Sequence, residues 1–261
     1  MKKAFTLLEL VVVLLVIALA THLAVREVAH IRNEKLVSVA DSQLEEIRKA
    51  SSAFLSDVGR PVSVTNGTLS ELWVKPDDVL EYRLRPASAA NLASGVDPAL
   101  AASSLRVPAG WRGPYIRLKS GRTKLRDPWG NAIELFDEAH LPRITLTNLF
   151  YAAQVSHYGA NGRIADKRTV DILPKNYSSS SLTVWARGNG LSGDVKLAWY
   201  GPASGMITGC VKTVSANVQH TFEGLTPGNR IVTAAKAGSS VPVVRLVEIL
   251  PGDNLLEIEI P

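Results

Sequence analysis

The sequence predicts an α+β protein in which one long N-terminal helix packs on a small antiparallel sheet and an all-β sandwich follows. Three observations lead to this fold class: residues 5–58 contain no Pro or Gly, residues 59–177 hold short segments between turns, and residues 182–261 hold evenly spaced short strands. The 261 residues are 46% apolar and 20% charged, which excludes a disordered chain and a multi-spanning membrane protein. The single cysteine, Cys210, excludes an internal disulfide.

The first part of the predicted helix is apolar enough to cross a membrane. Residues 5–25 form a run of 21 residues that ends before Arg26, and as a helix they would span about 30 Å. Lys2 and Lys3 precede this run, so the positive-inside rule places the N-terminus on the cytoplasmic face. We therefore expect one transmembrane segment, with the bulk of the chain on the opposite side.

Glu9 is the unexpected residue within this segment. A removable secretory signal ending near residue 20 would need a shorter apolar run. A plain signal anchor fits the length but has no use for a carboxylate four residues into the hydrocarbon. If the chain were cut between Ala4 and Phe5, the new α-amino group of Phe5 would be a cation close to Glu9, on the same copy or on a neighbouring one.

The helix is predicted to continue past the membrane to residue 58. Both charge signs occur in residues 26–58, and Gly59 and Pro61 form a stop signal. Residues 5–58 together would make a helix of about 80 Å; two separate helices are the alternative. One face of the second part is largely apolar at steps of three and four residues: Leu36, Ala40, Leu44, Ile47, Ser51, Phe54 and Val58.

Residues 59–177 predict a globular head. Residues 87–104 are rich in Ala and Ser and predict a variable loop with one helical turn around residues 98–102. Asp127-Pro128 and Gly130-Asn131 predict a tight turn, and residues 133–136 and 144–156 alternate as strands do.

The last part predicts a separate β-sandwich. Serines at 178–181 predict a linker, and turn signals recur every eight to twelve residues beyond it. The predicted strands of this 182–261 domain are residues 182–186, 195–200, 206–213, 218–222, 230–236, 241–250 and 255–260.

The N-terminal residues 3–10, Lys-Ala-Phe-Thr-Leu-Leu-Glu-Leu, resemble the class III signal of type IV pilins and of the pseudopilins of type II secretion. Further along, Trp-Arg-Gly-Pro-Tyr at 111–115, Asp-Pro-Trp-Gly-Asn at 127–131 and Tyr-Gly-Ala-Asn-Gly at 158–162 resemble, in this order, the head of the major pseudopilin family, general secretion pathway protein G. The chain departs from the family at Ala4, which is usually Gly, and at Ala18 and Arg26, where Gly and Pro commonly interrupt the helix.

This resemblance implies a processing and assembly pathway. Residues 1–4 would be a leader that prepilin peptidase removes between Ala4 and Phe5, after which it methylates the amine of Phe5. Phe5 and Glu9 would direct assembly with copies of the same chain and with other pilins or pseudopilins. An assembly ATPase and an inner-membrane platform would drive it, and the fold would be a pilin fold anchored in the inner membrane with its head in the periplasm or in an extracellular filament.

The resemblance also raises a calcium site. Members of the family often hold calcium in the C-terminal loop of the head, and the matching ligands here are Asn161, Asp166 and Asp171. An ion-free turn, with the two Asp residues salt-bridged or solvated, is the alternative. It is favoured by the cations among these candidate ligands: Arg163, Lys167 and Arg168.

No motif in the chain predicts catalysis, so an enzyme is not expected. Residues 222–232 resemble the strand-turn-strand of carboxypeptidase regulatory-like modules, which are usually binding or spacer domains. Between residues 83 and 126 nine basic residues face one acid, Asp97, which indicates a solvated face or a contact with an acidic neighbour or lipid; a nucleic-acid partner is not expected. The basic residues are Arg83, Arg85, Arg106, Arg112, Arg117, Lys119, Arg122, Lys124 and Arg126.

The sequence therefore predicts a structural subunit of a type II secretion or type IV pilus-like filament. Two other functions stay open: a minor pilin or adhesin whose sandwich binds a glycan or a protein, and a membrane-anchored periplasmic enzyme.

Overall fold

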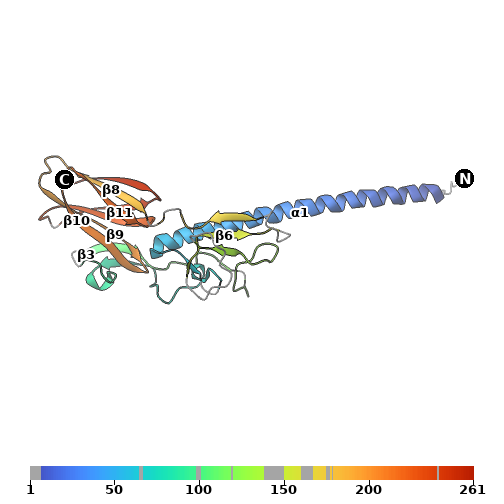
Figure 1. The fold of residues 1–261 in the computed structure, drawn as a ribbon, viewed down its shortest axis with the longest axis horizontal. Helices are drawn as coiled ribbons and strands as arrows, with labels where there is room; N and C mark the ends of the chain where they lie inside the picture. Colours follow the sequence, from blue (N-terminus) through green and yellow to red (C-terminus); the bar gives the residue numbers. More distant parts are fainter. Residues whose placement is uncertain are drawn as a thin grey trace.

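A computed structural model shows an α+β chain with one long N-terminal helix and a C-terminal part rich in β-strands. The structure describes residues 7–64, 67–97, 101–118, 120–137, 150–159, 167–174, 177, 179–239 and 241–261. Helix α1 projects from a head formed around its C-terminal half, and the β-rich part lies beyond the end of the helix (Figure 1).

Helix α1, Leu7–Val58, is continuous over 52 residues and about 78 Å. The prediction of one helix is therefore confirmed over the described residues, and the alternative of two separate helices is wrong. The predicted stop is also confirmed, because Gly59 takes a φ of +84° and its N–H donates to the carbonyl of Leu55 at 2.9 Å. A left-handed glycine of this kind is a common helix C-terminal cap.

The head packs on the second half of α1. The predicted apolar face is buried from residue 40 onward, whereas Leu36 is half-buried. Strands β4 (Glu134–Phe136), β6 (Gln154–His157) and β7 (Arg168–Asp171) form an antiparallel sheet in the order β4-β6-β7. Leu135, Val155 and Ile172 share one core with the helix residues Leu44, Ile47, Ala50, Phe54 and Val58.

The predicted strand at residues 144–156 is wrong as one continuous strand. Residues 144–149 lie outside the described residues, and the remainder divides into β5 (Phe150–Tyr151) and β6. Strand β5 pairs with β1 (Ser63–Val64), whereas β6 pairs with β4 and β7. The division falls at Ala152 and Ala153 because their N–H groups donate to different neighbours, the carbonyls of Val62 and Phe136.

The predicted turn at 127–131 is confirmed. The carboxylate of Asp127 accepts hydrogen bonds from the backbone N–H of Trp129 at 3.1 Å and of Asn131 at 2.7 Å. The N–H of Gly130 donates to the Asp127 carbonyl at 3.0 Å. Asp127 thus holds this turn through its own side chain, as Asp commonly does.

A hairpin replaces part of the predicted loop at 87–104. Strand β2 (Arg83–Ala87) pairs with β3 (Ala102–Ala109), and short 3₁₀ turns lie at η1 (Ser70–Leu72) and η2 (Ala89–Asn91). Residues 98–100 of the predicted helical turn at 98–102 lie outside the described residues, and Ala102 begins β3. The ends of the predicted loop form strands because Ala87, Leu105 and Val107 bury against the sandwich.

All seven predicted strands of the sandwich are confirmed. One sheet has the order β10-β9-β12-β13 and the other the order β11-β8-β14, with β14 parallel to β8. The two sheets share one core, to which β8, β9, β11, β12, β13 and β14 all contribute. The strands are β8 (Ser180–Arg187), β9 (Asp194–Ala203), β10 (Met206–Ser215), β11 (Gln219–Leu225), β12 (Gly228–Lys236), β13 (Val243–Ile249) and β14 (Asp253–Glu259).

The sandwich begins inside the predicted linker at 178–181. Strand β8 begins at Ser180, so two of the four predicted linker serines belong to the sandwich, and Ser180 is fully buried. The sandwich also meets the end of α1 directly, because the N–H of Asn229 donates to Ser56 Oγ at 3.3 Å. A Cβ built on Gly59 would lie 1.9 Å from the carbonyl oxygen of Pro202.

We predict that Gly59→Ala destabilises the protein far more than Gly95→Ala. Both glycines have nearly the same positive φ, +84° and +83°, but a Cβ on Gly95 meets nothing within 4 Å. The Gly95→Ala variant measures backbone strain alone, about 1 kcal/mol. The Gly59→Ala variant adds overpacking against Pro202, where the sandwich meets the end of α1, and should cost at least about 2 kcal/mol more. Chemical denaturation of the two variants checks this. Equal unfolding free energies would mean that the sandwich does not press on the helix end.

Candidate functional site

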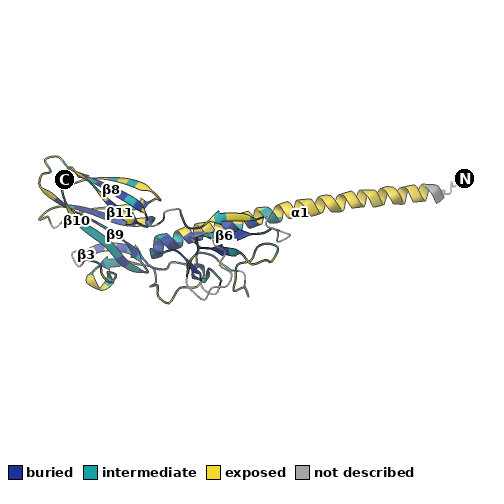
Figure 2. Ribbon diagram, viewed as in Figure 1, coloured by how far each residue is buried: buried dark blue, intermediate teal, exposed yellow. Residues whose placement is uncertain are grey.

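Within the part of the chain that the structure describes, nothing covers the first half of α1. Leu15 is 65% exposed and Val25 is 63% exposed, and Figure 2 shows this half of the helix as exposed, whereas buried and exposed residues alternate along the half inside the head. Exposed apolar surface of this extent marks a membrane or protein contact. The large side chains that form it are Leu10, Val11, Val12, Val13, Leu14, Leu15, Val16, Ile17, Leu19, Leu23, Val25, Val28 and Ile31.

This half of α1 is long and apolar enough to cross a membrane once. From Leu7 to Val25 the helix rises about 28 Å, close to the thickness of the hydrocarbon core. The chain is therefore compatible with single-pass anchoring.

Glu9 lies on this apolar half, in the first turn of the described helix, and it is exposed. A carboxylate near a helix N-terminus is favoured by the helix dipole. Ala4 and Phe5, the residues predicted for processing, methylation and assembly, lie outside the described residues. The predicted relation between Glu9 and the amine of Phe5 stays a prediction.

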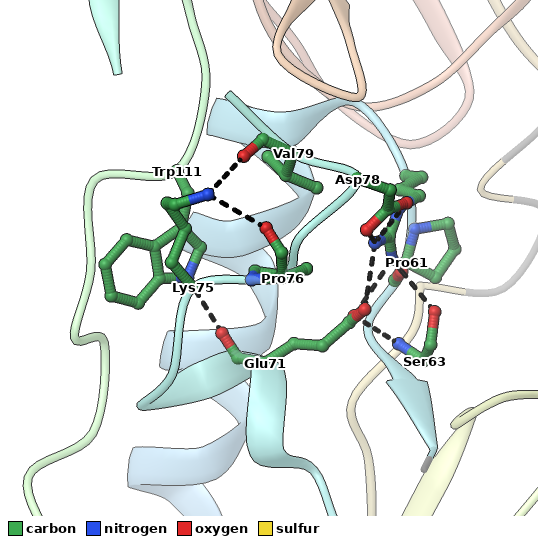
Figure 3. Close-up of polar contacts among 9 residues, drawn as sticks. Pro61, Ser63, Glu71, Lys75, Pro76, Asp78, Val79 and Trp111 are labelled. Carbon is green, nitrogen blue, oxygen red and sulfur yellow. Dashed lines mark hydrogen bonds and ion pairs between the residues drawn. The ribbon is translucent and has the colours of Figure 1, made fainter. Parts of the chain in front are cut away.

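A buried ion pair joins the segment just after α1 to the head. Arg60, which follows the helix, donates to both carboxylate oxygens of Glu71 at 2.8 and 2.9 Å, and these side chains are only 14% and 10% exposed. Figure 3 shows the Glu71 carboxylate beside the N–H of Ser63, which donates to it at 2.7 Å, and the Trp111 ring reaching the Glu71 carbonyl. Arg60 also lies 3.2 Å from the exposed carboxylate of Asp78, so it keeps one ion pair if Glu71 is removed. Removal of Arg60 would leave the buried Glu71 carboxylate without this compensation, so the contact fixes where the head sits on α1.

Asp57, in the last turn of α1, makes a second contact of this kind. Its carboxylate accepts a hydrogen bond from the Tyr115 hydroxyl at 3.1 Å and lies 3.1 Å from Arg112 Nε, while its carbonyl accepts from the Gly110 N–H. Burial raises the pKa of Asp57, and Arg112 and Tyr115 offset part of that rise. Asp57 thus attaches the end of α1 to the segment that carries the Trp-Arg-Gly-Pro-Tyr motif at 111–115.

The sequence did not predict the role of Arg230, on strand β12. Arg230 is 2% exposed, and its guanidinium donates to the Thr226 carbonyl and to the Asn229 carbonyl, both at 2.9 Å. It also donates to the Thr226 hydroxyl, and burial lowers its pKa to about 10. Arg230 therefore holds the 226–229 turn that meets Ser56 on α1; the Thr-Pro-Gly-Asn signal at 226–229 predicted the turn but not its partner.

The structure describes only one of the predicted calcium ligands. Asn161 and Asp166 lie outside the described residues, and Asp171, in β7, accepts a hydrogen bond from Gln154 Nε2 at 2.5 Å. Lys167, one of the cations expected to oppose a metal, instead lies 3.3 Å from Glu134 Oε2. No group of three or more His, Cys, Asp or Glu side chains that could hold a metal occurs among the described residues.

Comparison with known proteins returns no match, neither to a model of a protein family nor to a curated protein.

We predict that Asp57→Asn gains stability relative to the wild type as the pH rises. The folded-state pKa lies above the ordinary 3.8, so the protonated form is the one that folding favours. The stability that this proton contributes is present below about pH 4 and is lost as the pH rises through the folded pKa. The unfolding free energy of Asp57→Asn minus that of the wild type should therefore increase between about pH 4 and pH 7, as measured by denaturant titration. The exposed Asp77→Asn variant is the control, and a difference that falls with pH would contradict the account.

Proposed function

We propose that this protein is a pilin-like structural subunit that is processed between Ala4 and Phe5 and assembles into a filament through α1. The observation that carries the proposal is the division of one continuous helix into an exposed apolar half bearing Glu9 and a half clamped into a head. The motifs at 3–10, 111–115, 127–131 and 158–162 support the pilin fold and the pseudopilin family in particular. In this proposal the chain is not an enzyme.

Before assembly, the subunit is held in the inner membrane with its head in the periplasm. Lys2 and Lys3 support this orientation. Prepilin peptidase removes residues 1–4, and an ATPase with its membrane platform moves the processed subunit out of the bilayer. The filament is either a secretion pseudopilus or an extracellular pilus.

Assembly replaces the lipid contacts of α1, the stem of the subunit, by contacts with the α1 helices of other copies. Lipid tails are as apolar as the Leu and Val side chains, so close packing rather than hydrophobic transfer must select the partner. A carboxylate at the depth of Glu9 is tolerated where a cation lies close, and the Phe5 amine of a neighbouring copy supplies one. Such a pair adds little net stability but defines the axial register between copies.

A second candidate is a minor pilin or adhesin, and the sandwich supports it. On the outer face of β8, β11 and β14, the half-buried Trp185 lies opposite Gln219 on one side and Glu257 on the other, and Arg187, which pairs with Glu257, lies over its ring. An aromatic ring flanked by hydrogen-bonding side chains suits a glycan or a protein partner. Binding of the full-length protein to a glycan array, lost in Trp185→Ala, would favour this function.

We predict that Glu9→Ala and Glu9→Gln insert into the membrane as the wild type does but fail to assemble. The apolar length is unchanged, whereas the charge that fixes the register is removed. Membrane fractionation reports insertion, and co-purification of two differently tagged full-length copies reports assembly, with a loss of about tenfold or more expected for a register error of about 1.4 kcal/mol or more. Glu223→Ala, an exposed acid on the sandwich, is the control. Wild-type assembly of Glu9→Gln would contradict the role of the charge.

A further inference from the structure

A groove runs between α1 and the segment 116–130 of the head. It encloses about 690 Å³, and its floor is mostly apolar. Its rim carries four cations that are all exposed: Arg117, Arg122, Lys124 and Arg126. The apolar residues of the floor are Leu36, Val39, Ile47, Ile116, Leu118, Leu125, Pro128 and Trp129.

The rim cations exceed the carboxylates of the groove. Glu46 lies on the helix side, and Asp127 is buried and accepts the hydrogen bonds of its own turn, which leaves a net charge of about +2. Within the described part of the chain, no ion pair joins any of the four rim cations to a carboxylate. Arg126 donates to the Gly130 carbonyl, which leaves its charge uncompensated. The groove therefore suits an amphipathic partner that carries negative charge.

The groove continues toward the membrane along the same flank of α1. A shallower apolar surface formed by Val28, Ile31 and neighbouring residues shares Leu36 and Val39 with it. Val28 and Val39 are 65% and 56% exposed. A long, straight partner lying parallel to α1 would fill both surfaces together.

A different flank of α1 is acidic. Glu9 and Glu27 are 18 residues apart, which is five full turns, so they lie on one side of the helix. Glu27, Glu34 and Asp41 follow at steps of seven, which drift by only about 20° per step. His30 lies 3.5 Å from Glu34, and His157 of the head lies 3.5 Å from Asp41. Leu36, Val39 and Gln43 of the groove lie roughly 100–200° around the helix from Glu27.

We propose that the groove of one copy receives α1 of a second copy, with Glu34 and Asp41 of the second copy facing the rim cations. The inference rests on the proposed assembly through the stem and names a second contact in it. If the Phe5 amine of one copy lies level with Glu9 of the next, the two helices are offset by four residues. That offset brings Glu34 level with residue 38 and Asp41 level with residue 45, within the 36–47 stretch that lines the groove.

A second copy fits the groove better than lipid head groups do. Leu36, the first groove residue on α1, lies eleven residues beyond Val25, which places it about 16 Å past the apolar span. Attraction to a charged membrane surface is screened over about 8 Å at physiological salt. A neighbouring α1 anchored in the same membrane runs parallel at this height and carries both apolar side chains and acids.

The contact joins two different surfaces, the acidic flank of one copy and the groove of another. Contacts of this heterologous kind do not close a dimer, because one copy keeps its acidic flank free and the other keeps its groove free. They extend instead into a ring or an open helical array. This is the geometry that a filament subunit requires.

Charge reversal in the full-length chain tests the proposal. Two differently tagged copies are produced in one membrane, extracted in detergent and co-purified. Glu34→Lys with Asp41→Lys should lower the co-purified fraction at least fivefold, and so should Arg122→Glu with Lys124→Glu. The four substitutions together in one chain should restore at least half of the wild-type fraction, because opposite charges face each other again. A disulfide between Glu34→Cys in one copy and Lys124→Cys in the other, in a Cys210→Ser background, should link the two tags.

Matched controls reverse exposed charges on the sandwich, Glu223→Lys with Glu259→Lys and Lys212→Glu with Lys236→Glu, and should change nothing. The proposal would be overturned if the variant with all four substitutions did not regain co-purification. It would also be overturned if neither pair of charge reversals lowered the co-purified fraction. Unchanged co-purification together with weakened binding of Arg122→Glu/Lys124→Glu to vesicles of phosphatidylglycerol would assign the groove to lipid and overturn it as well. If Glu9→Ala disrupts assembly but the reversals do not, the groove contact alone fails. If the reversals and their rescue hold while Glu9→Ala assembles normally, the stem mechanism fails and the groove contact stands.

Discussion

The structure depends on one uninterrupted helix that must satisfy two environments. The backbone of residues 7–58 supplies its own hydrogen bonds, so the same helix can lie in lipid or among other stems at one end and in a protein core at the other. Only the side chains change, from exposed Leu and Val in the first half to a buried stripe from Ala40 to Val58 in the second. Because no Gly or Pro interrupts α1, there is no built-in kink at the boundary between the two halves.

The end of α1 determines where everything else sits. Gly59 terminates the helix, the Arg60–Glu71 pair and Asp57 attach the head, and Ser56 meets the 226–229 turn that Arg230 holds. The β2–β3 hairpin also packs on the outer face of the sandwich, and the N–H of Ala93 donates to the Ile207 carbonyl on β10. The sandwich is therefore built onto the end of the stem at several points. A displacement of α1 would therefore also move the sandwich.

Much of this architecture could be predicted because it follows from local pattern. The helix, its stop at Gly59, the Asp127 turn and the seven sandwich strands all depend on periodicity or on turn residues close in sequence. The contacts between distant segments could not be predicted in the same way. The hairpin was missed because its buried residues, Ala87, Leu105 and Val107, face a sheet that begins more than 80 residues later. The groove was missed for the same reason, since the charge run at 83–126 says nothing of the helix that it faces.

We propose that a cut ahead of Phe5 makes α1 ready for assembly. Mass spectrometry of the N-terminal peptide from the mature protein in its native membrane tests this most directly. The account predicts a chain that begins at Phe5 and carries a methyl group on its α-amine. A mature protein that retains Met1, or one trimmed at another residue, would contradict it and would leave a membrane-anchored protein with a head and a sandwich but no basis for polymerisation.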